Sequence, residues 1–89
     1  MNNKIILSSL ALDLKRVALG LHRNSIPMAE RFFTEAMRRK EEIELDLVPT
    51  YIQNIVSKFD GLKQKSTQDQ AEYALMYSTL IQNFALTLP

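Results

Sequence analysis

The apolar residues of this chain recur with the three- and four-residue spacing of amphipathic helices. Residues 3–23 carry the first stripe, formed by Leu7, Leu10, Leu14, Val17 and Leu21. At 3.6 residues per turn these positions share one face of a helix, as expected for a face that packs on a core. Asn2 or Asn3 can cap the first turn with a side-chain oxygen. We therefore predict a first helix over residues 3–23.

A second helix is predicted over residues 26–44. Ser25 suits its N-cap, and Pro27 fits its first turn because that turn leaves N–H groups unpaired anyway. Its apolar stripe is Ala29, Phe32, Phe33, Ala36, Met37 and Ile43. Residues 43–47 alternate between apolar and polar and could form a short strand, but no second strand is available to pair with them. We interpret them as the frayed helix end and a connector.

A third helix is predicted over residues 49–65. Pro49 disfavours helical geometry at the residue before it, which places the boundary between the second and third helices near residues 45–48. The apolar face of the third helix comprises Ile52, Ile55, Val56, Phe59 and Leu62. Gly61 leaves open whether this helix ends early.

The fourth helix is predicted over residues 67–86. Ser66 or Thr67 can cap it, and Thr67 with Gln70 fits the capping-box pattern. Its inward side comprises Tyr73, Met76, Tyr77, Leu80, Ile81 and Phe84. Four helices joined by short turns predict an all-α fold, a small antiparallel four-helix bundle formed by residues 1–89 as one domain. We expect the shared core to contain Phe33, Leu14, Val17, Ile55, Phe59, Leu80 and Phe84.

Composition narrows the possible classes of protein. The chain has 89 residues and no cysteine, which excludes disulfide bonds, thiolate metal sites and a cysteine nucleophile. Two glycines and three prolines are too few for a turn-rich β fold. No run approaches the roughly 20 apolar residues that span a bilayer, and the first residues lack the cleavage site of a signal peptide. We therefore expect a cytoplasmic protein that does not bind membranes.

Charge is distributed unevenly, although the net charge is only +1. Residues 1–40 carry eight Lys and Arg against three Asp and Glu, whereas residues 41–60 carry one against five. The basic residues of the first two helices include Lys15, Arg16, Arg23, Arg31, Arg38, Arg39 and Lys40. They indicate a small nucleic-acid-associated regulator as the alternative function. The glutamates interleaved in the second helix would repel phosphates, so nucleic acid is not the expected partner.

No residue pattern supplies an active site, a cofactor site or a metal site. His22 ends the first helix, where the helix dipole favours a cation. Leu19 stands where a Glu-x-x-His metal motif needs glutamate. The acidic residues after the second helix lack the spacing of a calcium loop, and we expect them to form a solvated end of the bundle. They are Glu41, Glu42, Glu44 and Asp46.

Two further features have both a functional and a structural interpretation. Lys40 falls within the apolar stripe of the second helix, where a desolvated lysine could act as a base or nucleophile. The expected outcome is extension of its amine to water or local pairing with Glu44. The aromatic residues could line a ligand cavity, but at helical spacing we expect them to fill the core. They are Tyr51, Tyr73, Tyr77, Phe32, Phe33, Phe59 and Phe84.

The first helix carries a second apolar ridge, formed by Ile5, Leu12 and Leu19. These residues are spaced by seven and lie nearly opposite the core-facing stripe. Arg16 and Arg23 flank them, as in interfaces with an apolar centre and a charged margin. We therefore predict a homo-oligomer, most simply a two-fold homodimer, with much of its interface on this helix. The alternative is a first helix packed on both sides within its own chain.

The function expected from these features is that of a non-enzymatic helical interaction module. It would self-associate through the ridge of the first helix and could also dock onto a larger protein. The residues expected to form the interface are Ile5, Leu12, Leu19, Arg16 and Arg23.

Overall fold

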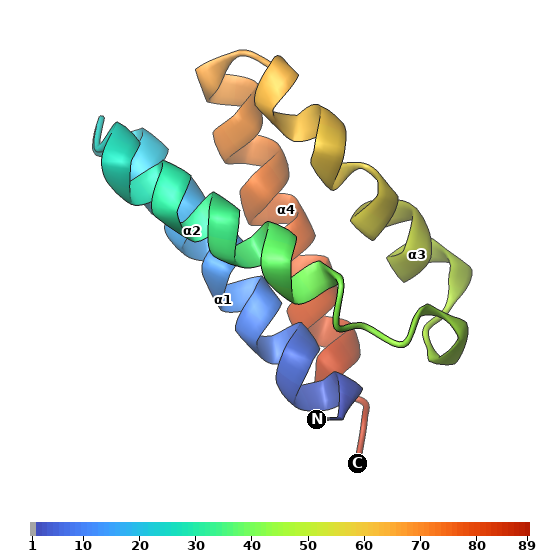
Figure 1. The fold of residues 1–89 in the computed structure, drawn as a ribbon. Coiled ribbons are helices and arrows are strands. Elements are labelled where there is room, and N and C mark those ends of the chain that lie inside the picture. The colour runs from blue at the N-terminus through green and yellow to red at the C-terminus, as the bar shows by residue number, and fades with distance from the viewer. Residues whose placement is uncertain (1) are drawn as a thin grey trace.

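The structure is a computed structural model that describes residues 2–89 (Figure 1). Within that range it contains four α-helices, two short 3-10 helices and no strand. The α-helices are α1 (Asn3–His22), α2 (Ile26–Lys40), α3 (Thr50–Ser57) and α4 (Thr67–Ala85), and the 3-10 helices are η1 (Leu45–Leu47) and η2 (Phe59–Gln64). Successive α-helices run in opposite directions, so α1 begins at the end of the bundle where α4 ends. The predicted all-α antiparallel four-helix bundle is confirmed.

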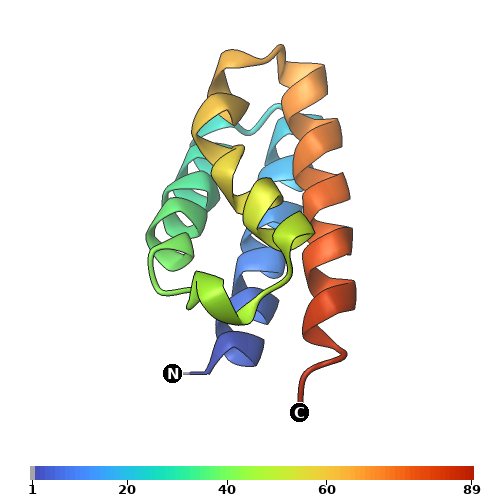
Figure 2. The same cartoon turned by 90° about the vertical axis from the view of Figure 1, so that its right-hand side faces the viewer.

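α1 makes the most extensive contacts with other helices in the bundle. It packs along its length against both α2 and α4, while α3 and η2 cover the opposite side of the bundle (Figure 2). Its buried residues form a wide arc that comprises Ile6, Leu7, Leu10, Ala11, Asp13, Leu14, Val17, Ala18, Gly20 and Leu21. The remaining arc of α1 faces outward, between its two neighbours.

Two asparagines fix the beginning of α1. The side-chain oxygen of Asn2 accepts a hydrogen bond of 2.9 Å from the N–H of Ile5, which makes Asn2 the N-cap. Asn3 lies in the helix and binds the backbone of Glu44 in both directions, donating at 3.2 Å and accepting at 3.0 Å. This pair of bonds holds the connector after α2 against the start of α1.

The turn from α1 to α2 is a complete Schellman motif. The N–H of Ser25 donates to the carbonyl of Gly20 at 2.8 Å, and that of Asn24 donates to Leu21 at 3.2 Å. Asn24 has a φ of 56°, a left-handed conformation that asparagine adopts more readily than most residues. Ser25 is the N-cap of α2 and Pro27 lies in its first turn, as expected, but the Ser25 hydroxyl makes no capping hydrogen bond.

α2 ends at Lys40, four residues before its predicted end at residue 44. The next three N–H groups, from Glu41 to Ile43, each donate to a carbonyl three residues back, which tightens the chain and stops the α-helix. Ile43 is buried beneath this turn. Residues 43–47 form no strand and continue into η1, in agreement with their interpretation as a connector.

α3 ends at Ser57, eight residues before its predicted end at residue 65. From the N–H of Lys58, which donates to Ile55 at 3.1 Å, the chain follows three-residue spacing through η2. In a 3-10 helix residues three apart are aligned, so Phe59 and Leu62 both reach the core. The α-helix therefore ends before Gly61, and the glycine is not what ends it.

The N-cap of α4 is Ser66, whose hydroxyl accepts from the N–H of Asp69 at 3.2 Å. The capping box predicted for Thr67 and Gln70 is wrong. Gln70 instead donates from its side-chain amide to the carbonyls of Lys63 and Lys65, which satisfies the end of η2.

The inward face of α4 differs from the predicted one. It consists mainly of small residues, and its buried members are Ala71, Ala74, Tyr77, Ser78, Ile81 and Ala85. Ser78 donates a hydrogen bond of 2.6 Å to the carbonyl of Ala11, so the two helices lie close together. The prediction of a buried Leu80 is wrong, because its side chain is 38% exposed. Phe84 is only partly buried, whereas the other five predicted core residues are buried.

Candidate interaction surface

The apolar ridge of α1 lies on the outer surface of the folded chain. Ile5, Leu12 and Leu19 are 51%, 46% and 37% exposed, respectively. Their seven-residue spacing aligns them along the arc that faces away from the core. α1 does pack on two sides within its own chain, as the alternative expectation had it, but this packing leaves the ridge uncovered.

A groove of about 400 Å³ extends this surface from α1 onto α4. Leu12 and Lys15 form its wall on α1, and Leu75 with Thr79 forms much of its wall on α4. Leu75 is 45% exposed and adds an apolar side chain next to the centre of the ridge. Sequence reasoning missed Leu75 because it lies outside the apolar stripe of its own helix, and only the packing of α4 on α1 brings it beside Leu12.

An aromatic residue held between two arginines borders the ridge on the α2 side. The guanidinium carbon of Arg16 lies 5.1 Å from the ring centre of Phe32, and that of Arg31 lies 5.3 Å from it. These distances are in the range of cation–π contacts. Arg23 is exposed near the end of the ridge. The flanking arginines therefore differ, because Arg16 is fixed against a ring and Arg23 extends to water.

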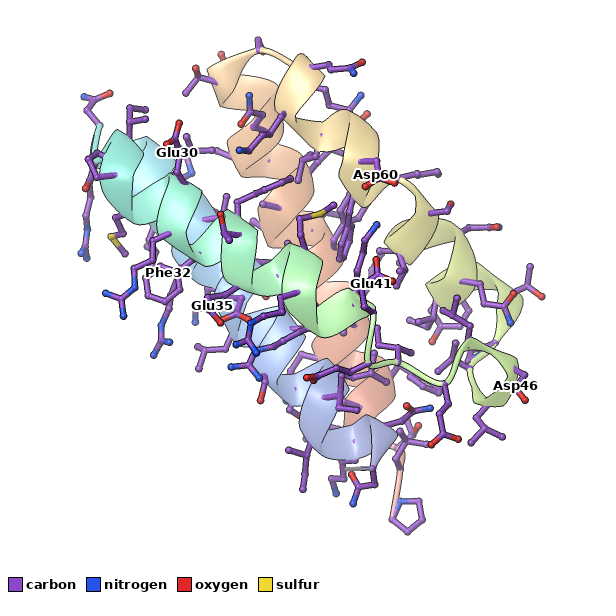
Figure 3. All side chains as sticks on the ribbon, viewed as in Figure 1. Glu30, Phe32, Glu35, Glu41, Asp46 and Asp60 are labelled. Carbon is purple, nitrogen blue, oxygen red and sulfur yellow. The ribbon has the colours of Figure 1, made fainter. Side chains whose placement is uncertain are left out.

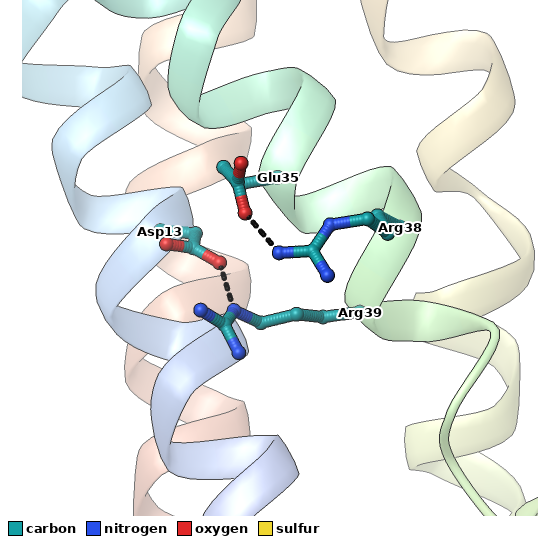
Figure 4. A network of polar contacts seen from close by, with 4 residues as sticks. All are labelled: Asp13, Glu35, Arg38 and Arg39. Carbon is teal, nitrogen blue, oxygen red and sulfur yellow. Dashed lines mark hydrogen bonds and ion pairs between the residues drawn. The ribbon is translucent and has the colours of Figure 1, made fainter.

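Beside this surface, Asp13 and Arg39 form an ion pair that joins α1 to α2 (Figure 4). The Nε of Arg39 donates to a carboxylate oxygen of Asp13 at 2.8 Å, and Asp13 is buried. Burial raises the pKa of Asp13, although the hydrogen bond and charge of Arg39 oppose that shift. Sequence reasoning missed Asp13, yet its spacing of three from Leu10 and four from Val17 places it on the core-facing arc.

The free energy of unfolding should depend on pH through the titration of Asp13. Because its pKa is raised on folding, the folded state binds this proton more tightly than the unfolded chain. The contribution is fully present below the unfolded value and is lost as the pH rises through the folded value. In urea unfolding at mildly acidic pH, wild type should therefore lose stability relative to Asp13→Asn as the pH increases.

The contribution of Glu35 to stability should change with pH in the opposite direction. The hydrogen bond from Arg38 lowers the pKa of Glu35, so its contribution is lost as the pH falls. Wild type should therefore gain stability relative to Glu35→Gln as the pH increases. The charged groups near Asp13 are Arg39, Glu35 and Arg16. If the stability difference from wild type changed with pH in the same direction for Asp13→Asn and Glu35→Gln, the raised pKa of Asp13 would be contradicted.

Most of the basic residues proposed for nucleic-acid contact are engaged within the chain. Arg38, Arg39 and Lys40 pair with carboxylates, and Arg16 and Arg31 lie against Phe32. A cation already paired with a carboxylate gains less from a phosphate. These contacts give the nucleic-acid alternative no support.

Lys40 is held in an ion pair, but not with the partner expected. Its amine lies 3.0 Å from a carboxylate oxygen of Asp60 in η2, and its side chain is only 12% exposed. The local pairing expected with Glu44 is wrong, because the chain after Lys40 leaves the α-helix before a fourth residue can come within reach. The pair links the end of α2 to η2, which is a structural role.

The other chemically reactive candidates do not gather into a site. His22 is exposed at the end of α1. Glu41 directly follows α2 and Asp46 lies in η1, and both are exposed (Figure 3). Within residues 2–89 no three His, Asp or Glu side chains are close enough to share a metal ion. The aromatic residues are divided, since Phe33, Phe59 and Tyr77 are buried while Tyr51 and Tyr73 are exposed.

Comparison of the chain with known families, curated proteins and solved structures finds no match. Across residues 2–89, none of the helices combines the length and apolar character needed to span a bilayer. The candidate interaction surface therefore rests on the geometry of this chain alone. It consists of the α1 ridge, the groove with Leu75, and Arg16 with Phe32.

Proposed function

We propose that this protein is a non-enzymatic helical interaction module that self-associates, most simply as a homodimer, and can dock onto a larger protein. The observation that carries the proposal is the exposure of Ile5, Leu12 and Leu19 on a bundle that has already buried the other stripe of α1. Isolated exposed leucines are ordinary, but an aligned apolar ridge bordered by a groove that adds a further exposed leucine, Leu75, is typical of an interaction surface.

The energetic argument favours association of the whole face. Fully burying each ridge side chain contributes roughly 1.5–3 kcal/mol before the cost of association, and these side chains are already half-buried. A stable interface also covers about 800 Å² on each partner, more than three side chains provide. The neighbouring groove and the Arg16–Phe32 contact would supply the remaining area. The ridge is therefore expected to be the centre of the interface rather than its full extent.

Replacing Leu12 with glutamate tests the proposal. The substitution places a carboxylate at the centre of the ridge, where burial of an unpaired charge is unfavourable, and should weaken self-association about 100-fold or more. Light scattering at tens of micromolar should find a dimer for wild type and a monomer for Leu12→Glu. Circular dichroism of the variant should remain helical, because Leu12 is not part of the core.

Leu45→Glu is the matched control. Leu45 is a leucine of η1 that is 43% exposed, close to the 46% of Leu12, and it belongs neither to the ridge nor to the lining of the groove. This variant should remain dimeric. A wild-type protein that is monomeric at tens of micromolar would contradict the proposed self-association, and equal weakening by both variants would place the interface elsewhere.

A further inference from the structure

We infer that two copies of this chain meet through an antiparallel pair of α1 helices, with a two-fold axis beside Leu12. Ile5 of each copy then packs against the partner's Leu19. The inference rests on the proposed self-association and adds the direction and register of the paired helices.

The spacing of the ridge is symmetric about its central residue. Ile5 and Leu19 each lie seven residues from Leu12, or roughly 10 Å along a helix that rises 1.5 Å per residue. A two-fold axis across the helix at Leu12 therefore places the ridge of one copy along the whole ridge of the other. In this register residue i lies opposite residue 24 − i of the partner. All six ridge side chains are then buried together.

Charge favours the antiparallel over the parallel arrangement. The outer arc of α1 carries the cations Lys15, Arg16 and Arg23, while the only acidic residue of α1, Asp13, is buried against Arg39. A parallel pair would set each cation beside its own copy, and like charges across an interface are unfavourable. In the antiparallel register residues 15 and 16 lie level with the partner's residues 8 and 9. Both of those are serines, which can accept hydrogen bonds.

The two flanks of the ridge favour the same arrangement. On the α4 side the ridge is bordered by the groove, which Leu75 and Lys15 line together with polar residues of α4. On the α2 side it is bordered by a charged edge, where Phe32 lies between Arg16 and Arg31. An antiparallel two-fold pair sets like flanks face to face, so the grooves next to Leu12 meet each other. A parallel pair would set each groove against the charged edge of α2. Apolar contact with Leu75 is therefore continuous with the ridge only in the antiparallel pair.

Cysteine cross-linking tests this register without interference, because the chain has no cysteine of its own. A disulfide requires Cβ atoms about 3.5–4.5 Å apart, whereas residues 5 and 19 are roughly 21 Å apart along the helix. Leu12→Cys should form a covalent dimer on mild oxidation. Ile5→Cys and Leu19→Cys should not cross-link alone. They should cross-link to each other when mixed, with one of them carrying a tag that separates the products by size.

Ser57→Cys, at an exposed position on α3, measures cross-linking by random collision. Light scattering of each reduced variant first establishes that it is a dimer. Cross-linking of Ile5→Cys to itself, or no cross-linking above the Ser57→Cys level at any ridge position, would overturn the antiparallel register while leaving the proposed self-association intact. Monomeric wild type would overturn both.

Discussion

Replacing Phe59 with alanine should unfold the protein or leave it close to unfolding. The side chain is 1% exposed and is one of the largest fully buried groups in the bundle. Its ring lies 6.1 Å from that of Tyr77, so it connects η2 to α4. Truncating a buried phenylalanine costs about 3–5 kcal/mol, while whole domains have only about 5–15 kcal/mol of stability and short chains lie at the lower end.

Phe84→Ala is the control for the loss of an aromatic ring. Phe84 is partly buried and contacts Tyr51 edge-on, with ring centres 6.3 Å apart. This variant should remain folded with a modest decrease in melting temperature, since each 1 kcal/mol shifts the melting temperature of a domain this size by roughly 4–8 °C. Thermal melts followed by circular dichroism measure both. A Phe59→Ala protein that melts within a few degrees of wild type would contradict the assigned core.

The bundle could be predicted from the sequence because helix periodicity is a local signal. The predicted limits of α1 and α4 lie within one residue of those observed, since caps and turns mark them in the sequence. The ends of α2 and α3 could not be predicted in the same way. At both ends the N–H groups donate to carbonyls three residues back, as in a 3-10 helix. Apolar residues three apart, such as Phe59 and Leu62, are compatible with an α-helix or a 3-10 helix.

The face that α4 presents to α1 also could not be predicted from the sequence. Ranking positions by hydrophobicity favours Met76 and Leu80, but close packing of two helices selects alanine and serine at the contact. Met76 and Leu80 then remain partly exposed, although Tyr77 and Ile81 of the same helix are buried. A pattern of small residues at Ala71, Ser78 and Ala85, spaced by seven, was the available signal.

The candidate surface, too, could be predicted from the sequence only in part. The ridge on α1 follows from spacing within one helix, so sequence alone could place Ile5, Leu12 and Leu19 on one line. Leu75 joins it only through tertiary packing. Asp13 and its partner Arg39 are 26 residues apart, and no local rule selects that pairing. Interactions between helices are therefore where the structure adds most to the sequence.

The two glycines should respond in opposite ways to replacement by alanine. At Gly20 the backbone of α1 lies close to that of α2, and a Cβ at this position would be 2.8 Å from the backbone nitrogen of Ala29. Backbone cannot rotate away as a long side chain can, so the helices would have to separate. We expect Gly20→Ala to lose about 1–3 kcal/mol of stability, because this overpacking exceeds the gain of about 1 kcal/mol in helix propensity.

Gly61→Ala is the matched substitution without the contact. A Cβ at Gly61 meets no atom within 4 Å, and its φ is not in the left-handed region. Alanine restricts the unfolded chain more than glycine does, so this variant should be unchanged or stabilised by up to about 1 kcal/mol. Urea unfolding of the two variants measures the difference directly. If Gly20→Ala were as stable as Gly61→Ala, the close contact between α1 and α2 at Ala29 would be wrong, and with it the placement of the α1 ridge relative to α2.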